Sequence, residues 1–431
     1  MQFKQYPSYK PSGVEWLGDV PEHWDSCNLK FISKIYAGGT PDRNRLDYWV
    51  KGEIPWINSG AVNQVIIKEP SEYITELGLK NSSAKYIPVN SLVMALAGQG
   101  KTKGMVAYTS IETTCNQSMA AIVPKNYHYK FLYYWLDSNY QNIRNLTGGD
   151  NRDGLNLAVL SNIPCPKISI VEQTQIVSFL DTETARIDNL IAKQEKLIEL
   201  LEEQRKSIIS HAVTKGLNPN APMKDSGVEW LGDVPEHWNL KRFGYLFDEN
   251  KKKNIGLKET NVLSLSYGNI KEKNIDDNKG LLPESFETYQ IIEPNNIVFR
   301  FTDLQNDKRS LRSAISKYHG IITSAYIAVK TKQNADFYNY LFRAYDLQKV
   351  FYSMGEGMRQ SLKMDELNKM PVVLPNKDEQ KRIVSFLDIE TARIDNLIAK
   401  QEKLIELLEE QRKSIISHAV TGKIDVREFG A

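Results

Sequence analysis

Apolar residues recur every three, four or seven positions over two long stretches of the chain. The stripe of the first stretch consists of Ile187, Leu190, Ile191, Leu197, Ile198, Leu201 and Ile208. Charged side chains fill most of the positions between them. This spacing is typical of an amphipathic helix with one buried face. We expect the helix to run from Thr182 to Thr214, with Asp181 as an N-cap or a kink.

The second stretch repeats the first. Ile176–Thr214 returns as Ile383–Thr421, with Ile389 in place of Thr182 as the one difference. A helix that is apolar on one side must bury that side, so its simplest partner is its own copy, packed antiparallel. The alternative is that each helix packs separately on its neighbouring domain. The residues expected to pair the helices are Ile187, Leu190, Ile191, Leu197 and Leu201, with Ile394, Leu397, Ile398, Leu404 and Leu408.

A shorter block is also duplicated, because Ser12–Trp24 returns unchanged as Ser226–Trp238. Between each block and helix lies a stretch of short apolar runs divided by Gly, Asn and Pro, which predicts strands. The strand candidates are Ile54–Ile57, Val62–Ile67, Ser91–Ala97, Met105–Tyr108 and Ala120–Val123, then Val262–Leu265, Asn296–Phe301, Ala314–Ile315 and Ala325–Val329. Each stretch then enters an aromatic-rich helix, at Phe131–Leu136 and Phe337–Phe342.

These patterns predict an α+β fold with internal pseudo-two-fold symmetry. Two homologous α/β domains are separated by two long antiparallel helices that form a coiled coil. The expected boundaries are 1–24 for an N-terminal arm and the first block, 25–170 for the first domain, 171–215 for the central helix, 216–238 for a linker and the second block, 239–376 for the second domain, 377–421 for the distal helix and 422–431 for a tail.

Composition narrows the class of protein. A chain of 431 residues with 41% apolar and 25% charged residues fits a soluble protein of two or more domains. Neither a membrane-spanning run nor a leader is recognisable, so we expect a cytoplasmic protein. Cys27, Cys115 and Cys165 have no metal-ligand spacing and form no disulfide framework. The net charge of +2 neither requires nor excludes nucleic acid, because binding depends on a local basic face.

Catalytic motifs are missing from the sequence. Ala95–Thr102 fits a loose phosphate-loop pattern, but a helix must follow the lysine of such a loop, and Met105–Tyr108 is expected to be a strand. There is no Asp/Asn-Pro-Pro-aromatic tetrapeptide of the amino-methyltransferase type, and no pair of metal ligands at helical spacing. His23 and His237 occur in identical Pro-Glu-His-Trp contexts, which favours a packing or turn element over catalysis. We therefore expect no catalytic residues and no metal site.

Polar, amide and guanidinium side chains gather at strand ends and in loops of both domains. Such groups can read base edges in DNA and hold its backbone. In the first domain the candidates are Arg43, Arg45, Trp56, Asn58, Ser59, Asn63, Gln99, Lys101, Lys103, Asn116 and Gln117. In the second they are Lys252, Ser266, Tyr267, Asn269, Arg300, Gln305, Lys308, Arg309, Arg312 and Tyr326. The strongest single candidate is the segment with Lys308, Arg309 and Arg312, since it places three cations within five positions.

Three further motifs point to a known family. They are Ile54-Pro55-Trp56-Ile57-Asn58, the run Asn116–Ile122, and the Glu-Gln-x-x-Ile-Val-x-Phe-Leu-Asp entry to each helix at Glu172–Asp181 and Glu379–Asp388. With its duplicated layout, the chain resembles the specificity subunits of Type I restriction-modification enzymes over nearly its whole length.

The resemblance implies a non-catalytic DNA-binding subunit of a prokaryotic cytoplasm. Its two target-recognition domains would each read one half of a bipartite double-stranded DNA site, and the paired helices would set the spacer. Two methyltransferase subunits would dock on the chain and methylate adenine N6 with S-adenosylmethionine. Two restriction subunits would carry ATP and Mg. This chain itself would bind no cofactor, and it would not bind a membrane.

Two alternatives remain open. The chain could be a duplicated coiled-coil scaffold whose middle domains bind proteins; salt-sensitive binding to a bipartite duplex, with methyltransferase present, distinguishes the two. It could also be a self-contained methyltransferase or nuclease, which the missing motifs disfavour. Transfer of tritium from S-adenosylmethionine by the isolated chain would support that reading.

Overall fold

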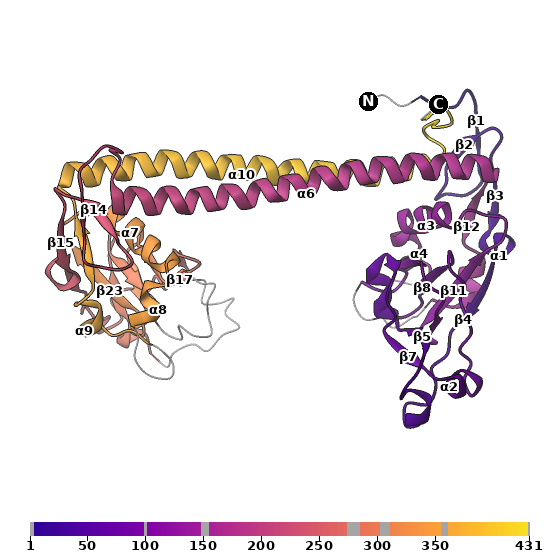
Figure 1. The fold of residues 1–431 in the computed structure, drawn as a ribbon, viewed down its shortest axis with the longest axis horizontal. Coiled ribbons are helices and arrows are strands. Elements are labelled where there is room, and N and C mark those ends of the chain that lie inside the picture. Colours follow the sequence, from indigo (N-terminus) through magenta and orange to yellow (C-terminus); the bar gives the residue numbers. More distant parts are fainter. Residues whose placement is uncertain are drawn as a thin grey trace. The chain divides into compact units, whose positions relative to one another are not determined.

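The computed structural model describes residues 4–98, 101–147, 155–273, 285–301, 311–354 and 361–429. The chain divides into two compact units. Unit 1 comprises Met1–Lys193 and Lys403–Ala431, and unit 2 comprises Gln194–Glu402. Each unit therefore holds one repeated block, one middle domain and parts of both long helices (Figure 1). Within the described ranges no helix is both long and apolar enough to cross a membrane.

Unit 1 is built around a five-stranded sheet with the order β4-β11-β8-β9-β6. Its strands are β4 (Ser33–Ala37), β6 (Ile66–Ile67), β8 (Leu92–Ala95), β9 (Val106–Thr109) and β11 (Met119–Pro124). A second sheet has the order β10-β5-β7, with β5 (Ile54–Ile57), β7 (Glu72–Ile74) and β10 (Thr114–Cys115). Two-stranded pairs join β1 (Tyr9–Pro11) to β2 (Asp19–Pro21) and β3 (Asp25–Asn28) to β12 (Pro164–Lys167). The short helices are α1 (Leu29–Ile32), η1 (Leu46–Tyr48), η2 (Ser59–Gln64), α2 (Glu76–Lys80), α3 (Tyr129–Ser138), α4 (Tyr140–Asn145) and α5 (Leu157–Ser161).

Unit 2 repeats this plan with shorter strands. Its central sheet has the order β16-β23-β20-β21, formed by β16 (Phe247–Glu249), β20 (Ile297–Phe299), β21 (Ser313–Ile315) and β23 (Ile327–Thr331). Two-stranded pairs join β13 (Met223–Asp225) to β14 (Asp233–Pro235), β15 (Asn239–Arg242) to β24 (Pro371–Leu374), β17 (Leu263–Ser266) to β18 (Asn269–Glu272), and β19 (Gln290–Ile292) to β22 (Gly320–Ile322). The short helices are η3 (Phe243–Tyr245), η4 (Phe286–Thr288), α7 (Ala335–Leu347), α8 (Val350–Met354) and α9 (Met364–Leu367).

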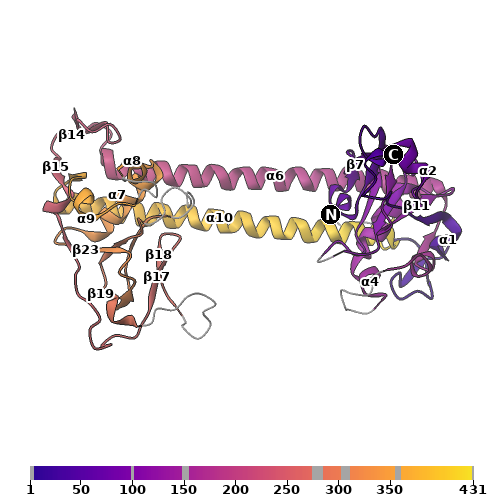
Figure 2. The same ribbon diagram turned by 90° about the horizontal axis from the view of Figure 1, so that it is seen from below.

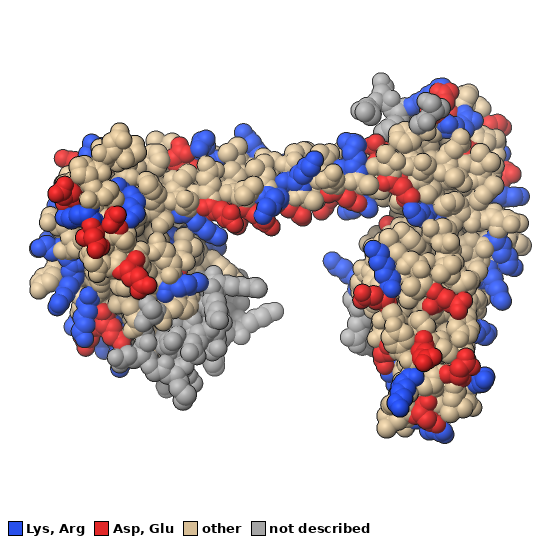
Figure 3. Space-filling view, in the orientation of Figure 1, with Lys and Arg blue, Asp and Glu red and all other residues tan. Residues whose placement is uncertain are grey.

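The two long helices are α6 (Ile170–Lys215) and α10 (Lys377–Val420), which lie side by side in both views (Figures 1 and 2). In unit 1 the early part of α6, at Ile176 and Ile187, shares a core with the late part of α10, at Ile415. In unit 2 the late part of α6, at Val213, shares a core with the early part of α10, at Ile383. The helices are therefore antiparallel, as predicted. Charged side chains of both signs are distributed along their visible surface, between residues of other kinds (Figure 3).

The residues expected to pair the helices are buried to different degrees. Ile187 and Ile394 are fully buried and Leu201 and Leu408 are 8% exposed. Leu190, Ile191, Leu397 and Ile398 are half-buried. Leu197 and Leu404 are 39% exposed, so these two lie at the margin of the apolar stripe.

The expected start of the central helix at Thr182 is wrong, because α6 begins at Ile170. Asp181 lies inside the helix, where its carboxylate accepts hydrogen bonds from the Tyr134 hydroxyl and the Lys130 ammonium group. Asp181 is therefore neither an N-cap nor a free surface carboxylate. Since Tyr134 belongs to α3, the long helix packs on its own middle domain as well as on α10. The alternative, in which each helix packs separately, is therefore wrong.

One expected strand is also wrong. The first half of Val62–Ile67 belongs to η2, which ends at Gln64, and only Ile66–Ile67 forms a strand. The side chain of Asn58 accepts a hydrogen bond from the backbone N–H of Gly60, which starts a helical turn where a strand was expected. At the loose phosphate-loop pattern, β9 follows the lysines and no helix does, so the nucleotide-binding geometry is absent among the residues described there.

Candidate nucleic-acid interface

In unit 1 polar side chains follow two neighbouring parallel strands. Cys115 of β10 pairs in register with Ile57 of β5, and the N–H of Asn116 donates to the Ile57 carbonyl at 3.0 Å. Asn58 follows β5, while Asn116 and Gln117 follow β10. Because parallel strands end at the same edge of a sheet, these amide side chains lie close together.

A glycine pair brings a third segment to this edge. The N–H of Gly39 donates to the Cys115 carbonyl at 2.8 Å, and a Cβ on Gly38 would lie 2.1 Å from the same oxygen. Only glycine permits so close an approach. Thr40 follows directly, and its hydroxyl donates to Oε1 of Gln117. We call Thr40, Asn58, Asn116 and Gln117 the unit 1 edge.

Local hydrogen bonds hold the amides of this region in place. The Asn58 side chain caps η2, and Nδ2 of Asn63 donates to the Gly60 carbonyl at 2.9 Å. Ser59 is half-buried within η2. Oδ1 of Asn116 is buried and accepts no hydrogen bond from any residue that the structure describes. A buried acceptor without a donor is costly, so this oxygen lowers the stability of the unit 1 edge.

The arginines near the unit 1 edge are held by carboxylates. Arg43 makes two hydrogen bonds to Glu72, at 2.6 and 2.9 Å, and its guanidinium stacks 3.7 Å from the centroid of the Trp49 ring. The hydrogen bond from Arg43 lowers the pKa of Glu72. Arg45 is likewise paired with Asp47, at 2.7 Å. Arg43 and Arg45 are therefore oriented cations with part of their charge compensated.

Two candidates of the first domain are buried. Trp56 is 2% exposed, and its Nε1 donates to the Gly39 carbonyl at 3.0 Å. It packs beneath the unit 1 edge. Lys103 is 3% exposed, whereas Lys101 is exposed. Gln99 lies outside the described residues.

Unit 2 has a corresponding polar edge with different side chains. Val262, just before β17, forms a parallel bridge with Ile321 of β22, as β5 does with β10. Thr323 and Ser324 follow β22 in the same way that Asn116 and Gln117 follow β10. At the end of β17 the hairpin turn carries Ser266, Tyr267 and Asn269, of which Tyr267 is 74% exposed. We call Ser266, Tyr267, Asn269, Thr323 and Ser324 the unit 2 edge.

The hairpin turn and the strand ends of unit 2 are each supported from behind. Nη2 of Arg343, on α7, donates to the Gly268 carbonyl at 2.8 Å. Nε2 of Gln290 donates to the carbonyls of Thr323 and Tyr326, at 3.2 and 2.6 Å. Tyr326 and Ser324 line a surface pocket of about 300 Å³ together with Lys251, Lys253 and Gln290. Hydroxyls beside two lysines suit a phosphate and a base edge.

The remaining candidates of the second domain have mixed outcomes. Arg312 is fully buried, with its backbone N–H donating to Oδ2 of Asp346 at 2.8 Å, so it is a core residue and no surface cation. Burial raises the pKa of Asp346. Lys252 is paired with Glu293 at 3.4 Å, and Arg300 is half-buried beside β21, where its N–H bonds to the Arg312 carbonyl. The candidates Gln305, Lys308 and Arg309 lie outside the described residues.

The structure adds Thr40, Thr323 and Ser324 to the candidates that the sequence suggested. Small hydroxyl residues in loops carry no motif of their own. The parallel pairing of strands distant in sequence brings them to the edge, and no local pattern contains that information.

Each unit also has a surface pocket where its repeated block meets the end of a long helix. In unit 1 the pocket measures about 600 Å³ and is lined by Gln5, Glu15–Gly18, Ser417, His418, Thr421, Lys423 and Ile424. In unit 2 it measures about 500 Å³ and is lined by Ser207, Ser210, His211, Thr214, Lys215, Glu229–Gly232 and Gln348. The block residues Glu-Trp-Leu-Gly and the helix residues Ser, His and Thr are the same in both. We call these the duplicated pockets.

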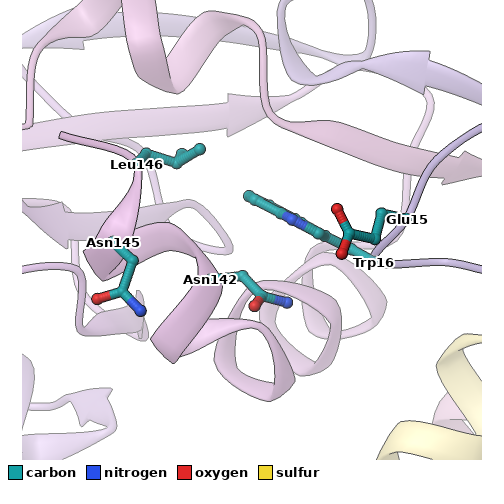
Figure 4. A pocket seen from close by; sticks show the side chains of 5 residues that line it. All are labelled: Glu15, Trp16, Asn142, Asn145 and Leu146. Atoms are coloured by element: carbon teal, nitrogen blue, oxygen red, sulfur yellow. The ribbon is translucent and has the colours of Figure 1, made fainter. Parts of the chain in front are cut away.

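A second surface hollow of unit 1 shares Glu15 and Trp16 with the duplicated pocket (Figure 4). The ring of Trp16 reaches into it, with the carboxylate of Glu15 beside the ring and Asn142 and Asn145 projecting from α4. In both units a lysine ties the helix end to the block. Lys423 donates to the Asp19 carbonyl at 2.6 Å, and Lys215 donates to that of Leu231 at 2.9 Å.

The two histidines of the repeated blocks contact the starts of the long helices. Nε2 of His23 lies 3.0 Å from Oε2 of Glu172, and Nε2 of His237 lies 2.9 Å from Oε2 of Glu379. Among the described residues no cluster of His, Cys, Asp and Glu could hold a metal ion. The histidines therefore join the block to the helix.

Comparison with known proteins identifies the class to which this fold and these edges belong. The family model of the Type I restriction modification DNA specificity domain matches residues 21–200 and 314–409. The chain belongs to this family: it is a DNA specificity subunit of a Type I restriction-modification system, a non-catalytic component of the enzyme.

Specificity subunits of other Type I enzymes align with this chain along about half or nearly all of its length. The chain is 31% identical to the EcoR124I/EcoR124II specificity subunit of Escherichia coli over 206 residues, which are 46% of this chain and 48% of that subunit. It is 21% identical to the MjaIX specificity subunit of Methanocaldococcus jannaschii over 433 residues, which are 96% of each.

Two solved structures share the fold. A chain from a study of complex assembly and conformational transition of the type I R-M system matches with a TM-score of 0.69 and 14% identity, covering 93% of this chain and 98% of that one. The HsdS subunit from Thermoanaerobacter tengcongensis matches with a TM-score of 0.55 and 14% identity, over 94% and 98% of the two chains. The predicted α+β fold with paired long helices is thereby confirmed.

Proposed function

We propose that each unit reads one half of a bipartite double-stranded DNA site. The unit 1 edge offers two asparagines, a glutamine and a threonine, whereas the unit 2 edge offers serines, threonine, asparagine and tyrosine. Asn and Gln pair with adenine in the major groove, while hydroxyls accept several base edges. Since the edges occupy comparable places in homologous domains but differ in chemistry, the two half-sites differ in sequence.

The observation that carries this proposal is the contrast between constant and variable parts. The same aspartate and arginine of the repeat pair in both units, as Asp188 with Arg412 and as Asp395 with Arg205. The duplicated pockets are also lined by the same residue types. Identical surfaces fit two copies of one partner, and unlike edges fit two unlike sequences.

The partner that fits the identical surfaces is a methyltransferase subunit, bound twice. The paired helices set the spacer between the half-sites, and the repeated surfaces dock the two methyltransferases. These subunits carry S-adenosylmethionine and methylate adenine N6 in each half. Two restriction subunits add ATP and Mg for cleavage, and this chain supplies neither cofactor.

The low net charge of +2 agrees with a shared interface. Phosphate contacts dominate the affinity of DNA-binding proteins and its dependence on salt. A chain whose arginines are partly neutralised by Glu72 and Asp47 is poorly equipped to supply them all. The methyltransferase subunits would contribute the rest, so we expect weak DNA binding by this chain alone.

A domain exchange tests the proposal. Asp25–Gln175 is replaced by the same stretch of another family member, and the complex with methyltransferase is expressed in a host that lacks other adenine methylation. Sequencing of methylated adenines should show one half of the site changed and the other kept. Exchange of Asn239–Arg382 is the matched control and should change the opposite half. Exchanges that alter both halves, or neither, contradict the proposal.

A further inference from the structure

In unit 1 two short segments cover the start of α6. They are Lys4–Tyr6 and Ile424–Phe429, which we call the clasp. The ring of Phe429 meets that of Phe179 edge-on, with centroids 4.9 Å apart. The Arg427 carbonyl accepts a hydrogen bond from Nε2 of Gln175 at 3.3 Å. Phe179 is only 1% exposed as a result.

The clasp is held together by its own contacts. The backbone N–H of Asp425 donates to the Lys4 carbonyl at 2.7 Å, and the Lys4 ammonium lies 3.1 Å from Glu428. Arg427 pairs with Asp425 at 2.7 Å and stacks 4.8 Å from the centroid of the Tyr6 ring. Ile424 and Val426 are 8% and 3% exposed and belong to the core of unit 1.

The clasp also completes a buried carboxylate site. The Tyr6 hydroxyl donates to Oε1 of Glu172 at 2.8 Å, and Nε1 of Trp24 donates to the same oxygen at 3.1 Å. With His23 on Oε2, both oxygens of Glu172 are engaged. Glu172 is 5% exposed, so these donors replace the water that it would otherwise bind.

The equivalent face of unit 2 is open. Phe386, the counterpart of Phe179, is 38% exposed, and Ile389 beside it is 67% exposed. Among the described side chains of unit 2, His237 contacts the Glu379 carboxylate, with Nε2 2.9 Å from Oε2. Nε1 of Trp238 is buried with no hydrogen-bond partner among the described residues, although its counterpart in unit 1 has one.

Together these differences define what is missing from unit 2. Among the described residues of unit 2, no aromatic ring covers Phe386 and no donor besides His237 reaches Glu379. In unit 1, Phe429 and Tyr6 make these two contacts. An occupant must supply both. The clasp of a second copy is not available, because Ile424 and Val426 are buried in that copy's own core. The occupant is therefore a different protein.

We propose that Glu379, Phe386 and Ile389 form a docking site for a segment of the methyltransferase subunit that carries an aromatic side chain and a hydroxyl or cationic donor. The clasp closes the equivalent face of unit 1. The two methyltransferase subunits consequently bind with unequal affinity, and unit 2 takes the first. This inference rests on the proposed function, since that function supplies the partner.

The test is a titration of the full chain with its methyltransferase subunit, followed by native mass spectrometry. The 1:1 complex should accumulate before the 2:1 complex, with two dissociation constants at least about tenfold apart. Phe386→Asp should weaken the tighter step by at least about tenfold. Phe386→Leu should preserve it, and Ser385→Asp, an exposed neighbour, is the matched charge control. Phe386 is partly exposed, so these variants should fold, which circular dichroism checks.

A second variant tests the clasp itself. Phe429→Ala removes the ring over Phe179. It should lower the dissociation constant of the weaker methyltransferase site and so bring the two dissociation constants closer. The inference would be overturned if the unmodified chain bound both methyltransferase subunits with equal dissociation constants. It would also be overturned if Phe386→Asp left the tighter dissociation constant unchanged. Either result would leave the proposed function intact. Failure of the methyltransferase to bind at all would contradict the proposed function and this inference with it.

Discussion

Arg412 donates from Nε to Oδ1 of Asp188 at 2.8 Å, and the same two positions of the repeat meet in unit 2, where Nε of Arg205 lies 3.6 Å from Oδ1 of Asp395. In each unit one long helix contributes the arginine and the other contributes the aspartate. A slip of the helices past one another would break both pairs. The duplicated charges therefore specify a single antiparallel register.

Charge exchange at this pair should be reversible. Asp188 and Arg412 are 53% and 36% exposed, so the pair contributes about 0.2–1 kcal/mol. Asp188→Arg places two guanidinium groups together and should lower the free energy of unfolding by about 1 kcal/mol. Adding Arg412→Asp should restore most of the lost free energy of unfolding. Urea unfolding of the full chain measures both, and a double variant no better than the single one would show that the pair does not set the register.

Base discrimination should be lost one half-site at a time. Gln117 and Tyr267 are exposed on the unit 1 and unit 2 edges. Gln117→Ala should reduce discrimination by about 1–3 kcal/mol at one or two base pairs of a single half-site. Tyr267→Ala should do so in the other half, so each variant controls for the other. Competition binding with base-substituted duplexes, in the presence of methyltransferase, provides the measurement. Melting temperatures should not change.

Trp56 should behave as a core residue and not as a DNA contact. Trp56→Ala should cost about 3–5 kcal/mol of unfolding free energy, because a large buried side chain is removed. Trp56→Phe should cost far less, and part of that loss is the hydrogen bond to the Gly39 carbonyl, worth about 1 kcal/mol. Urea unfolding compares the two. A stable Trp56→Ala variant with altered base preference would contradict the assignment.

Acid should loosen the clasp. The hydrogen bond from Arg427 lowers the pKa of Asp425 from its usual 3.8. A carboxyl group whose pKa is lower in the folded state stabilises that state above the unfolded pKa and loses this effect as pH falls through the folded one. Hydrogen exchange of Ile424–Phe429, corrected for intrinsic rates, should therefore rise below about pH 3.8. Asp425→Asn should exchange faster already at neutral pH and show a smaller change with acid.

Lengthening the helices should change the spacer alone. Four residues inserted within Gln194–Ile208, with four more in the matching part of α10, add roughly 6 Å of helix while nearly preserving the apolar face. The recognised half-sites should stay the same and their separation should grow by about one to two base pairs. Methylated-adenine sequencing reads out both. Insertion of two residues in each helix rotates the two apolar faces away from each other. It should therefore abolish adenine methylation by the complex.

Periodicity and repetition predicted the fold well. The apolar stripe of Ile187, Leu201 and their copies identified both long helices, and runs such as Ile54–Ile57 identified strands, because these signals are local. The start that periodicity predicted for α6, Thr182, was wrong by about three turns, whereas the expected segment boundary at residue 171 lies next to the observed start at Ile170. Its first residues pack on the repeated block and on α3, so their helical state depends on tertiary contacts that no periodicity reveals.

The site was harder to predict. Trp56, Lys103 and Arg312 were chosen for their chemistry, and all three are buried. Thr40 was overlooked although it contacts Gln117, since the contact arises only when Gly38 and Gly39 let two distant segments meet. Residue type suggests which side chains could read DNA, whereas the tertiary fold decides which of them are exposed.

Each long helix ends at a glycine with positive φ that rests on a proline and a tryptophan of a repeated block. Gly216 meets Pro235 and Trp238, which follow it closely, and Gly422 meets Pro21 and Trp24, which precede it by most of the chain. The packing of the helix-ending glycine on the repeated block therefore does not depend on whether the block precedes or follows the helix in the sequence. We therefore expect that a middle domain can be exchanged, or moved to another position in the chain, as long as its repeated block and the helix-ending glycine that packs on that block are kept.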